Sequence, residues 1–305
     1  MSDLPDFILF AQHGWADTNE EISKLAATLA TPNTKIISPN LGWVKTWLSI
    51  DPLVENVVIK AQEILDKYPE TPWRIIGHSM GGLIWLEVLH KHPQWWNKIH
   101  SLVLIASPVG GADLARIIDP LSIGVGIAAD LGKNRRYIAD RMTKIVPTLV
   151  IAGNIDNGSD GTIPVSSTKL SYGHFVCLPN ISHSQLKNHP SLVDVIQKFW
   201  KTSPTPALYE KDFPTILIER LQIIPGMTDA HPRDFEKAKT YLNFERGISI
   251  KLWKNPLNVL HIFVSNQQEE CLYAGFVGWI HSEALNQALE AIHQDYYQLV
   301  IHGLD

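Results

Sequence analysis

The sequence predicts an α/β fold with a mostly parallel sheet over about the first two hundred residues, followed by a small α+β unit. Short apolar runs alternate with amphipathic helical stretches up to residue 201, which is typical of β-α-β units. The segment 202–206, Thr-Ser-Pro-Thr-Pro, can neither continue a helix nor join a sheet interior, so it indicates a linker. We therefore expect two domains, at residues 1–201 and 207–305.

Six apolar runs are the expected strands of the parallel sheet, because their β-branched and apolar residues suit a sheet covered on both faces. The runs are residues 7–11, 35–38, 73–77, 101–106, 147–152 and 174–178. Four helical stretches separate or follow them, at residues 18–30, 52–67, 80–91 and 191–201. Thr18 and Glu21 predict a capping box at the start of the first helix, and Pro52 suits the first turn of the second.

The alternation of strands and helices breaks down between residues 112 and 146. This stretch is weakly periodic and contains the apolar, glycine-bearing run 123–129. Inside a compact α/β domain, such an insertion is more often a functional cap than a plain connector. We therefore expect residues 112–146 to form a cap or lid.

Residues 207–305 have a pattern of their own. It predicts strands at 215–224, 248–253, 259–264 and 272–276, and helices at 233–242 and from about residue 282. A small α+β domain of this kind is a candidate lid, a dimerisation surface for a homo-oligomer, or a partner-binding domain. The sequence alone does not choose among these roles.

The composition excludes several classes of protein. With 26 Lys and Arg against 31 Asp and Glu, the net charge is −5 and the pI is about 6.2, which argues against a nucleic-acid partner. The 45% of hydrophobic residues is enough for a substantial core, unlike the composition of disordered chains. Two cysteines, Cys177 and Cys271, cannot form a disulfide framework, and they fit a reducing compartment.

Neither a targeting segment nor a membrane span is expected. The first residues lack the cationic stretch and apolar core of a secretory signal. The longest weakly polar stretch, 121–131, is shorter than the roughly 20 apolar residues that span a bilayer. We therefore expect a cytoplasmic protein. The histidine spacing suggests no metal site, and no glycine loop with a lysine is present to hold phosphates, so no cofactor is predicted.

The strongest chemical signal is Gly77-His-Ser79-Met-Gly81, which lies directly between an expected strand and an expected helix. A serine on such a sharp turn stands out above the sheet edge, and the flanking glycines leave room for strained dihedrals. The helix that follows points its positive end at the turn. The alternative is a glycine-rich turn whose serine only caps a helix. The strand-to-helix placement favours Ser79 as a nucleophile.

A serine nucleophile needs an adjacent base, and the base needs an orienting acid. His183 comes just after the last expected strand, on the carboxyl side of the sheet. His174 opens that strand, and His189 belongs to the start of the next helix, so we favour His183 as the base. Two carboxylates compete for the role of acid. We favour Asp160, because Gly-Thr-Ile-Pro fixes the loop behind it, over Asp156, which suits a turn.

The oxyanion that forms during attack needs prearranged main-chain N–H donors. Met80 directly follows the nucleophile and is expected to supply one. His13-Gly-Trp15 follows the first strand, and Trp15 is expected to supply the other. The alternative is that His13 and Gly14 form an ordinary turn.

Aromatic residues near these loops predict the character of the substrate pocket. Trp43 and Trp47 lie on or near the next early loop, and we expect them to line the pocket together with His13. If these residues converge on the nucleophile, the pocket is apolar and suits an acyl chain or an aromatic ester. For any single tryptophan, packing in the core is the alternative.

Together these residues resemble the α/β-hydrolase superfamily, on its lipase and esterase side. The resemblance covers residues 6–201 and has the chain order Ser, Asp, His of that superfamily. It rests on His13-Gly-Trp15, Gly77-His-Ser-Met-Gly81-Gly82, Ser107-Pro-Val-Gly-Gly-Ala112, Ser159-Asp-Gly-Thr-Ile-Pro164 and His183. Residues 207–305 have no part in it.

The resemblance implies a serine hydrolase that cleaves a carboxylic ester of a small acyl substrate. Ser79, His183 and Asp160 would form its triad, and the N–H groups of Trp15 and Met80 its oxyanion hole. The same triad also serves thioesterases, amidases and acyltransferases. A function of a different class is a non-catalytic scaffold that binds a partner through residues 207–305.

Overall fold

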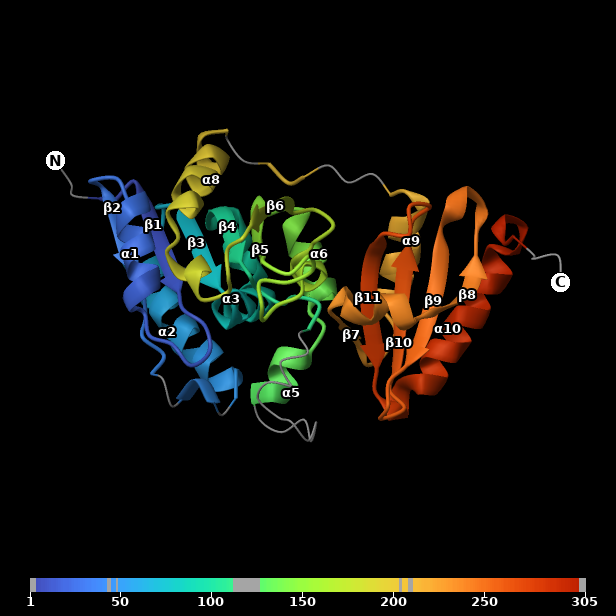
Figure 1. Cartoon of the computed structure of the whole chain (residues 1–305). Helices are drawn as coiled ribbons and strands as arrows, with labels where there is room; N and C mark the ends of the chain where they lie inside the picture. Colours follow the sequence, from blue (N-terminus) through green and yellow to red (C-terminus); the bar gives the residue numbers. More distant parts are fainter. Residues whose placement is uncertain are drawn as a thin grey trace. The chain divides into compact units, whose positions relative to one another are not determined.

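The computed structural model describes residues 4–42, 45–47, 49–111, 127–202, 205–207 and 211–301. Contacts divide the chain into two compact units, Met1–Tyr209 and Glu210–Asp305. The first contains a six-stranded parallel sheet, and the second contains a separate five-stranded antiparallel sheet (Figure 1). The predicted fold class, an α/β fold followed by a small unit with its own sheet, is confirmed.

The strands of the first sheet stand in the order β2-β1-β3-β4-β5-β6, and neighbours run parallel. They are β1 (Phe7–Gln12), β2 (Thr34–Ile37), β3 (Trp73–His78), β4 (Ile99–Ile105), β5 (Thr148–Asn154) and β6 (His174–Pro179). Each coincides with one of the six apolar runs that the sequence predicts as strands.

The strand order reverses between β1 and β3. From β1 the chain moves outward to β2 and then returns to place β3 on the other side of β1. In open α/β sheets, functional groups gather beyond the carboxyl ends of the strands at such a reversal. Gln12 at the end of β1 pairs with Gly77 near the end of β3. The loops that follow these two strands therefore start side by side.

Helices cover both faces of the parallel sheet. Those that bury apolar residues on one face are α2 (Asp51–Lys67), α3 (Met80–Lys91) and α6 (Arg136–Thr143). Those on the other face are α1 (Glu20–Leu29) and α8 (Pro190–Lys201). Trp73 and Trp85 are fully buried in the first of these cores. Burial of a large apolar side chain contributes roughly 1.5–3 kcal/mol, so these helices hold the sheet firmly.

Two local expectations for the first unit are wrong. α1 begins at Glu20 after Asn19 and without a side-chain cap hydrogen bond, so the predicted capping box does not form. Before the helix, the N–H of Thr18 instead donates to Asp17 Oδ1 at 2.9 Å. The second difference concerns β6, which stands at the edge of the sheet and leaves Phe175 37% exposed. A strand with one free edge cannot be covered as the inner strands are.

The predicted cap and linker are described in part. Residues 112–126 of the cap lie outside the described residues, and the described remainder contains α5 (Ile127–Gly132) and α6. Of the predicted linker, residues 202, 205 and 206 are described, and they belong to the first unit. His174 Nε2 donates to Thr205 O at 2.8 Å, and Ala207 N donates to Tyr172 O at 3.1 Å.

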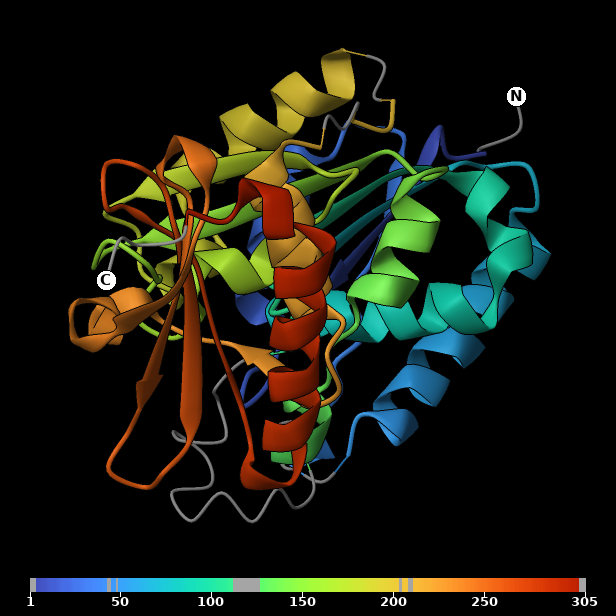
Figure 2. The same ribbon diagram turned by 90° about the vertical axis from the view of Figure 1, so that its right-hand side faces the viewer.

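The strands of the second sheet stand in the order β7-β11-β10-β9-β8, and neighbours run antiparallel. They are β7 (Met227–Asp229), β8 (Lys239–Asn243), β9 (Ser249–Lys254), β10 (Leu260–Ser265) and β11 (Cys271–Val277). Two helices, α9 (Phe213–Gln222) and α10 (Ser282–Asp295), lie on one face of this sheet (Figure 2). The larger of the two apolar clusters described in the second unit lies between these helices and the sheet.

The predicted strand at 215–224 is wrong, because most of this segment forms α9. Asp212 accepts the N–H of Thr215 at 2.9 Å and thereby caps the helix. Leu217 and Leu221, one helical turn apart, are both fully buried. Packing of this apolar stripe outweighs the strand preference of the β-branched residues.

The predicted helix at 233–242 is also wrong. It divides into the 3₁₀-helix η4 (Pro232–Lys237) and the edge strand β8, which pairs with β9. Cross-strand pairing therefore overrides the helical preference of its Lys, Glu and Ala residues. The short strand β7 has no counterpart in the sequence prediction. Among the helices within the described ranges, none has the length and apolar character that a membrane crossing requires.

Candidate active site

Ser79 stands on the turn between β3 and α3 in a strained conformation. Its φ of 54° and ψ of −125° lie outside the regions that non-glycine residues favour, at a cost on the order of 1–3 kcal/mol. The turn is held in place because Ser79 N donates to Ile105 O of β4 at 2.8 Å. α3 begins at the next residue, so its positive end lies beside the serine.

Two glycines of the predicted motif are required because main-chain atoms approach them closely. A Cβ on Gly77 would lie 2.5 Å from Gly82 Cα, and a Cβ on Gly81 would lie 2.3 Å from Gln12 O. A side chain at either position would push α3 away from β3 or from the end of β1. These glycines therefore determine how closely the nucleophile turn packs against the sheet.

His183 lies on the loop after β6 and contacts both other residues of the predicted triad. Its Nε2 is 3.1 Å from Ser79 Oγ, and its Nδ1 is 2.7 Å from Asp160 Oδ2. Its main-chain N–H also donates to Asp160 O at 2.9 Å. The carboxylate can only accept from Nδ1–H, so Nε2 is the nitrogen that accepts from the serine hydroxyl.

The two candidate acids have different partners. Asp160 is 2% exposed, and its Oδ1 accepts the N–H groups of Thr162 at 3.0 Å and Ile163 at 2.7 Å. Its Oδ2 is thereby turned toward His183. Asp156 accepts instead from Ser159, through its N–H and its hydroxyl, both at 2.7 Å. Asp156 therefore shapes the loop that carries Asp160.

The loop after β1 lies against the nucleophile turn. A Cβ on Gly14 would lie 3.0 Å from Ser79 Cβ and 3.4 Å from Met80 N. The main chain that leads from Gly14 to Trp15 therefore runs beside the serine and beside the first N–H of α3. Such an approach is what two convergent N–H donors of an oxyanion hole require.

His13 connects this loop to the loop after β2. The ring is 1% exposed, its Nε2 accepts the N–H of Leu41 at 3.0 Å, and its Nδ1 donates to Gly14 O at 3.0 Å. Burial lowers the pKa of His13, which keeps the ring neutral. The sequence places His13 in the substrate pocket, whereas in the structure both ring nitrogens bind main-chain groups.

Trp15 and Trp47 form an edge-to-face aromatic pair with ring centroids 4.4 Å apart. The next residue after Trp15 is tied to the same segment, because Ala16 N donates to Thr46 Oγ1 at 3.0 Å. Trp47 is 38% exposed, so the pair presents aromatic surface beside the loop after β1, which borders the serine. Trp43, the other predicted pocket tryptophan, lies outside the described residues.

Two contacts near the triad have no counterpart in the sequence analysis. Asp17 Oδ2 and Lys187 Nζ form an ion pair at 3.0 Å that joins the loop after β1 to the 3₁₀-helix η3 (Gln185–Lys187) beyond His183. His78, the variable residue before the nucleophile, has its ring 4.8 Å from that of His183. Neither spacing nor charge reveals partners so distant in the chain. His78 is the last residue of β3 and Lys187 lies in η3, so no local pattern of the sequence marks either one.

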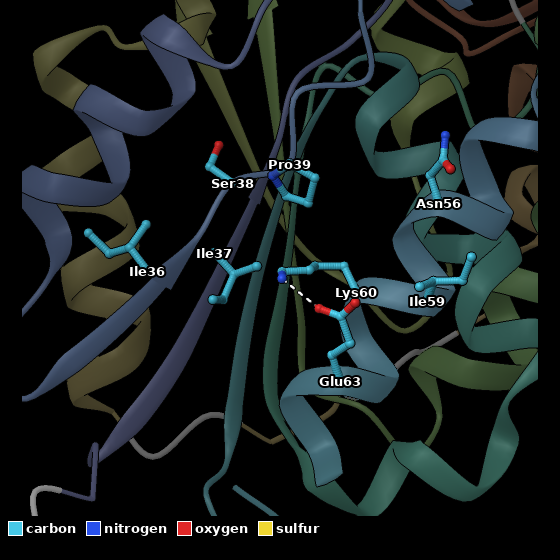
Figure 3. A pocket seen from close by; sticks show the side chains of 8 residues that line it. All are labelled: Ile36, Ile37, Ser38, Pro39, Asn56, Ile59, Lys60 and Glu63. Carbon is cyan, nitrogen blue, oxygen red and sulfur yellow. Dashed lines mark hydrogen bonds and ion pairs between the residues drawn. The ribbon is translucent and has the colours of Figure 1, made fainter. Parts of the chain in front are cut away.

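A groove of about 520 Å³ lies elsewhere on the first unit, between β2 and α2 (Figure 3). It is lined by Ile36, Ile37, Ser38, Pro39, Asn56, Ile59, Lys60 and Glu63. No predicted site residue lines it, and Lys60 pairs with Glu63 at 2.6 Å. Among the described residues, no cluster of three or more His, Cys, Asp or Glu side chains is arranged to hold a metal ion.

Comparisons with protein families and with solved structures find proteins similar to the first unit. The model of the family described as serine aminopeptidase, S33 (Hydrolase_4) matches residues 4–159. A solved structure of Est1E from Butyrivibrio proteoclasticus with ferulic acid bound is 14% identical, with 66% of this chain and 90% of that chain covered, at a TM-score of 0.50. At this identity the likeness shows a shared fold.

Two further solved structures are similar to the first unit. The mature lipase BlEst2 from Bacillus licheniformis is 14% identical, with 66% and 93% of the two chains covered and a TM-score of 0.49. The RedJ thioesterase of prodiginine biosynthesis from Streptomyces coelicolor is 16% identical, with 65% and 85% covered and a TM-score of 0.40. A search of curated proteins found no match.

Proposed function

We propose that this chain, which belongs to the serine aminopeptidase S33 family within the α/β-hydrolase superfamily, is a serine hydrolase that cleaves carboxylic esters through an acyl-enzyme. The observation that supports this most directly is the unbroken hydrogen-bonded chain from Ser79 Oγ through the His183 ring to Asp160 Oδ2. It begins on a strained turn and ends on a buried carboxylate, as nucleophilic catalysis by serine requires.

Acylation begins when Ser79 Oγ attacks the carbonyl carbon of the ester. His183 Nε2 takes the hydroxyl proton, and the electron pair of the carbonyl double bond moves to its oxygen. Asp160 stabilises the imidazolium through Nδ1–H and keeps the ring in the tautomer that accepts at Nε2. When the tetrahedral intermediate collapses, the carbon–oxygen bond to the leaving group breaks, and His183 returns the proton to the departing alcohol.

Deacylation repeats these steps with water. His183 Nε2 removes a proton from the water as its oxygen attacks the acyl carbonyl. The bond to Ser79 Oγ then breaks, the serine recovers its proton from His183, and the carboxylic acid leaves. In both steps the main-chain N–H groups of Met80 and Trp15 hold the oxyanion. A donor of this kind stabilises the transition state by about 3 kcal/mol.

The aromatic pair of Trp15 and Trp47 supports an apolar or aromatic substituent on the substrate. Trp15 lies on the loop that borders the nucleophile, and Trp47 packs against Trp15, so the acyl or alcohol portion of the ester would lie near this pair. Trp47→Ala should therefore raise KM for aromatic and longer acyl esters while leaving acetate esters little changed. An equal effect on all chain lengths would contradict this role.

Labelling of the nucleophile tests the proposed function. A fluorophosphonate probe should label the wild type and Ser191→Ala, a control at the start of α8, but not Ser79→Ala. A panel of p-nitrophenyl esters graded by acyl length then defines the substrate. If Ser79→Ala were labelled as strongly as the wild type, the proposal would be wrong. If the folded wild type took up no probe, a non-catalytic scaffold would be favoured.

The description of the matched family supports a second candidate, cleavage of an amide at the amino terminus of a peptide. The same triad would serve, with His183 protonating a departing amine. Parallel assays of aminoacyl p-nitroanilides and p-nitrophenyl esters distinguish the two substrates. The ester proposal predicts that kcat/KM is higher for the esters by more than the difference in their intrinsic reactivity. A preference for the anilides would contradict the ester proposal and favour cleavage of an amide.

A further inference from the structure

The ring of His78 lies beside the triad without being part of it. His78 ends β3 directly before Ser79, and it is 2% exposed. Its Nε2 is 3.2 Å from the main-chain oxygen of His183, and the two rings are tilted by 41° to each other with centroids 4.8 Å apart. The side chain thus spans from the nucleophile turn to the backbone of the histidine loop.

The partner of His78 determines its protonation. A carbonyl oxygen can only accept, so Nε2 must carry the proton and donate to His183 O. Nδ1 is then a bare lone pair, and it is buried without a hydrogen-bond partner among the described residues. A second proton there would create an unpaired interior charge. Burial lowers the pKa of His78 well below 6.5, and the nearby His183, Lys187 and His13 lower it further, so the ring is a neutral donor.

His183 therefore makes four hydrogen bonds, two through its main chain and two through its ring. Asp160 takes the main-chain N–H at 2.9 Å and ring Nδ1 at 2.7 Å. His78 Nε2 donates to the main-chain oxygen of His183 at 3.2 Å, and the hydroxyl of the next residue, Ser79, donates to ring Nε2 at 3.1 Å. The backbone of His183 is therefore held on both sides, and its ring is aligned between the same two segments.

We infer that His78 is a positioning residue of this site, which holds His183 at the correct distance from Ser79 through the main-chain oxygen of His183. The inference rests on the proposed serine hydrolase function. Because His78 and Ser79 are consecutive, one rigid turn supplies both the donor to the loop and the nucleophile that its ring must reach. A reaction slows greatly when its reacting groups are misplaced by about 1 Å. Losing the hydrogen bond from His78 to His183 O should therefore lower kcat.

Three substitutions and one control test this role. His78→Phe keeps a buried ring but removes the donor, and His78→Asn is too short to reach the carbonyl. Both should lower kcat about tenfold with KM little changed, the effect of losing one hydrogen bond. His78→Gln, whose amide nitrogen corresponds to Nε2, should stay within about threefold of the wild type. His100→Phe, at the opposite, amino end of the strands, should match the wild type.

A spectroscopic readout separates this inference from the proposed function. The Nδ1–H proton of His183, bonded to Asp160, should give a low-field proton resonance in the wild type and in His78→Gln. In His78→Phe and His78→Asn it should broaden by exchange with water, while urea unfolding shows that both remain folded. An unchanged resonance and unchanged kcat in the folded Asn or Phe variant would overturn the inference, as would a Gln variant as impaired as Phe.

The two proposals can fail separately in this experiment. If the wild type hydrolysed no ester and took up no fluorophosphonate, the proposed function would fail, and the resonance would still decide whether His78 positions His183. If the wild type were active and labelled at Ser79 while His78→Phe matched it in kcat and in the resonance, only the role of His78 would be rejected.

Discussion

His183 and Asp160 are joined by two hydrogen bonds, one from the ring Nδ1 to Oδ2 at 2.7 Å and one from the main-chain N–H to the main-chain oxygen at 2.9 Å. The main-chain bond fixes the histidine loop on the acid loop, and the ring bond then aligns the imidazole. Asp156, four residues earlier, is engaged with Ser159. The choice between the two carboxylates therefore depends on loop geometry.

Asp160→Asn should lower kcat about 10³-fold or more, because an amide at this position no longer favours the tautomer of His183 that accepts from Ser79. Asp156→Asn, the matched control on the same loop, should cost less than about tenfold, because it weakens the bonds to Ser159 and leaves the bond between Asp160 and His183 in place. Steady-state kinetics on one ester compare the two. The assignment of the acid would be reversed if Asp156→Asn were the more impaired variant.

Gly81→Ala should reduce both stability and activity, since its Cβ would lie 2.3 Å from Gln12 O and force α3 away from β1. Overpacking of this kind costs about 1–3 kcal/mol, and the displaced turn carries Ser79 with it. Gly132→Ala at the end of α5 is the control, because nothing lies within 4 Å of its Cβ position. Urea unfolding curves should separate the two variants. Equal stability would contradict the close approach.

The ion pair of Asp17 and Lys187 should contribute modestly to catalysis by holding the oxyanion loop against the histidine loop. Its atoms are 3.0 Å apart and the side chains are 16% and 27% exposed, which limits such a pair to about 1 kcal/mol. Asp17→Asn and Lys187→Met should each lower kcat a fewfold. The double variant should lose no more kcat than a single variant does. The effect should shrink in high salt. Independent, additive losses would argue against coupling between the loops.

His13 and His78 should make the free energy of unfolding fall in mild acid. Burial lowers the pKa of both rings below 6.5, so between 6.5 and the folded pKa the unfolded chain binds more protons than the folded one. The contribution of the two neutral rings to the free energy of unfolding is fully present above about pH 6.5. Below that pH it falls by up to about 1.4 kcal/mol per pH unit for each ring.

Urea unfolding between about pH 7.5 and pH 5.5 measures this dependence. His78→Phe is the informative variant, because it removes one of the rings whose pKa is lowered by burial. Its stability should change less steeply with pH than that of the wild type, whatever its absolute value. Parallel slopes for the two proteins would show that His78 does not titrate as its burial requires.

Much of the site could be anticipated from the sequence, because its residues follow strand ends. Ser79 directly follows one strand, and Asp160 and His183 lie on the loops that follow two others. Parallel strands carry their carboxyl ends to one edge of the sheet. His78 and Lys187 could not be anticipated in this way. His78 is a variable position inside a motif, and its partner is a main-chain oxygen, which leaves no mark in the choice of side chain.

The errors in the second unit have a different origin. Residues 215–224 are rich in β-branched residues and yet form most of α9, since Leu217 and Leu221 find a buried face there. Residues 239–242 follow helix-forming Lys and Ala and yet join β9 in the sheet. In both segments local preference is worth a few tenths of a kcal/mol per residue, less than the burial or pairing that opposes it.

By itself, the sequence determined the fold class, the six parallel strands and the chemical identity of the residues that converge at their ends. These follow from periodicity and from glycines at a strand-to-helix turn, which are local properties of the chain. Only the tertiary structure decided which acid faces His183, what His13 and His78 bind, and which segments of the second unit become helix. Those outcomes depend on distances between residues far apart in the chain, where packing and hydrogen bonding outweigh local preference.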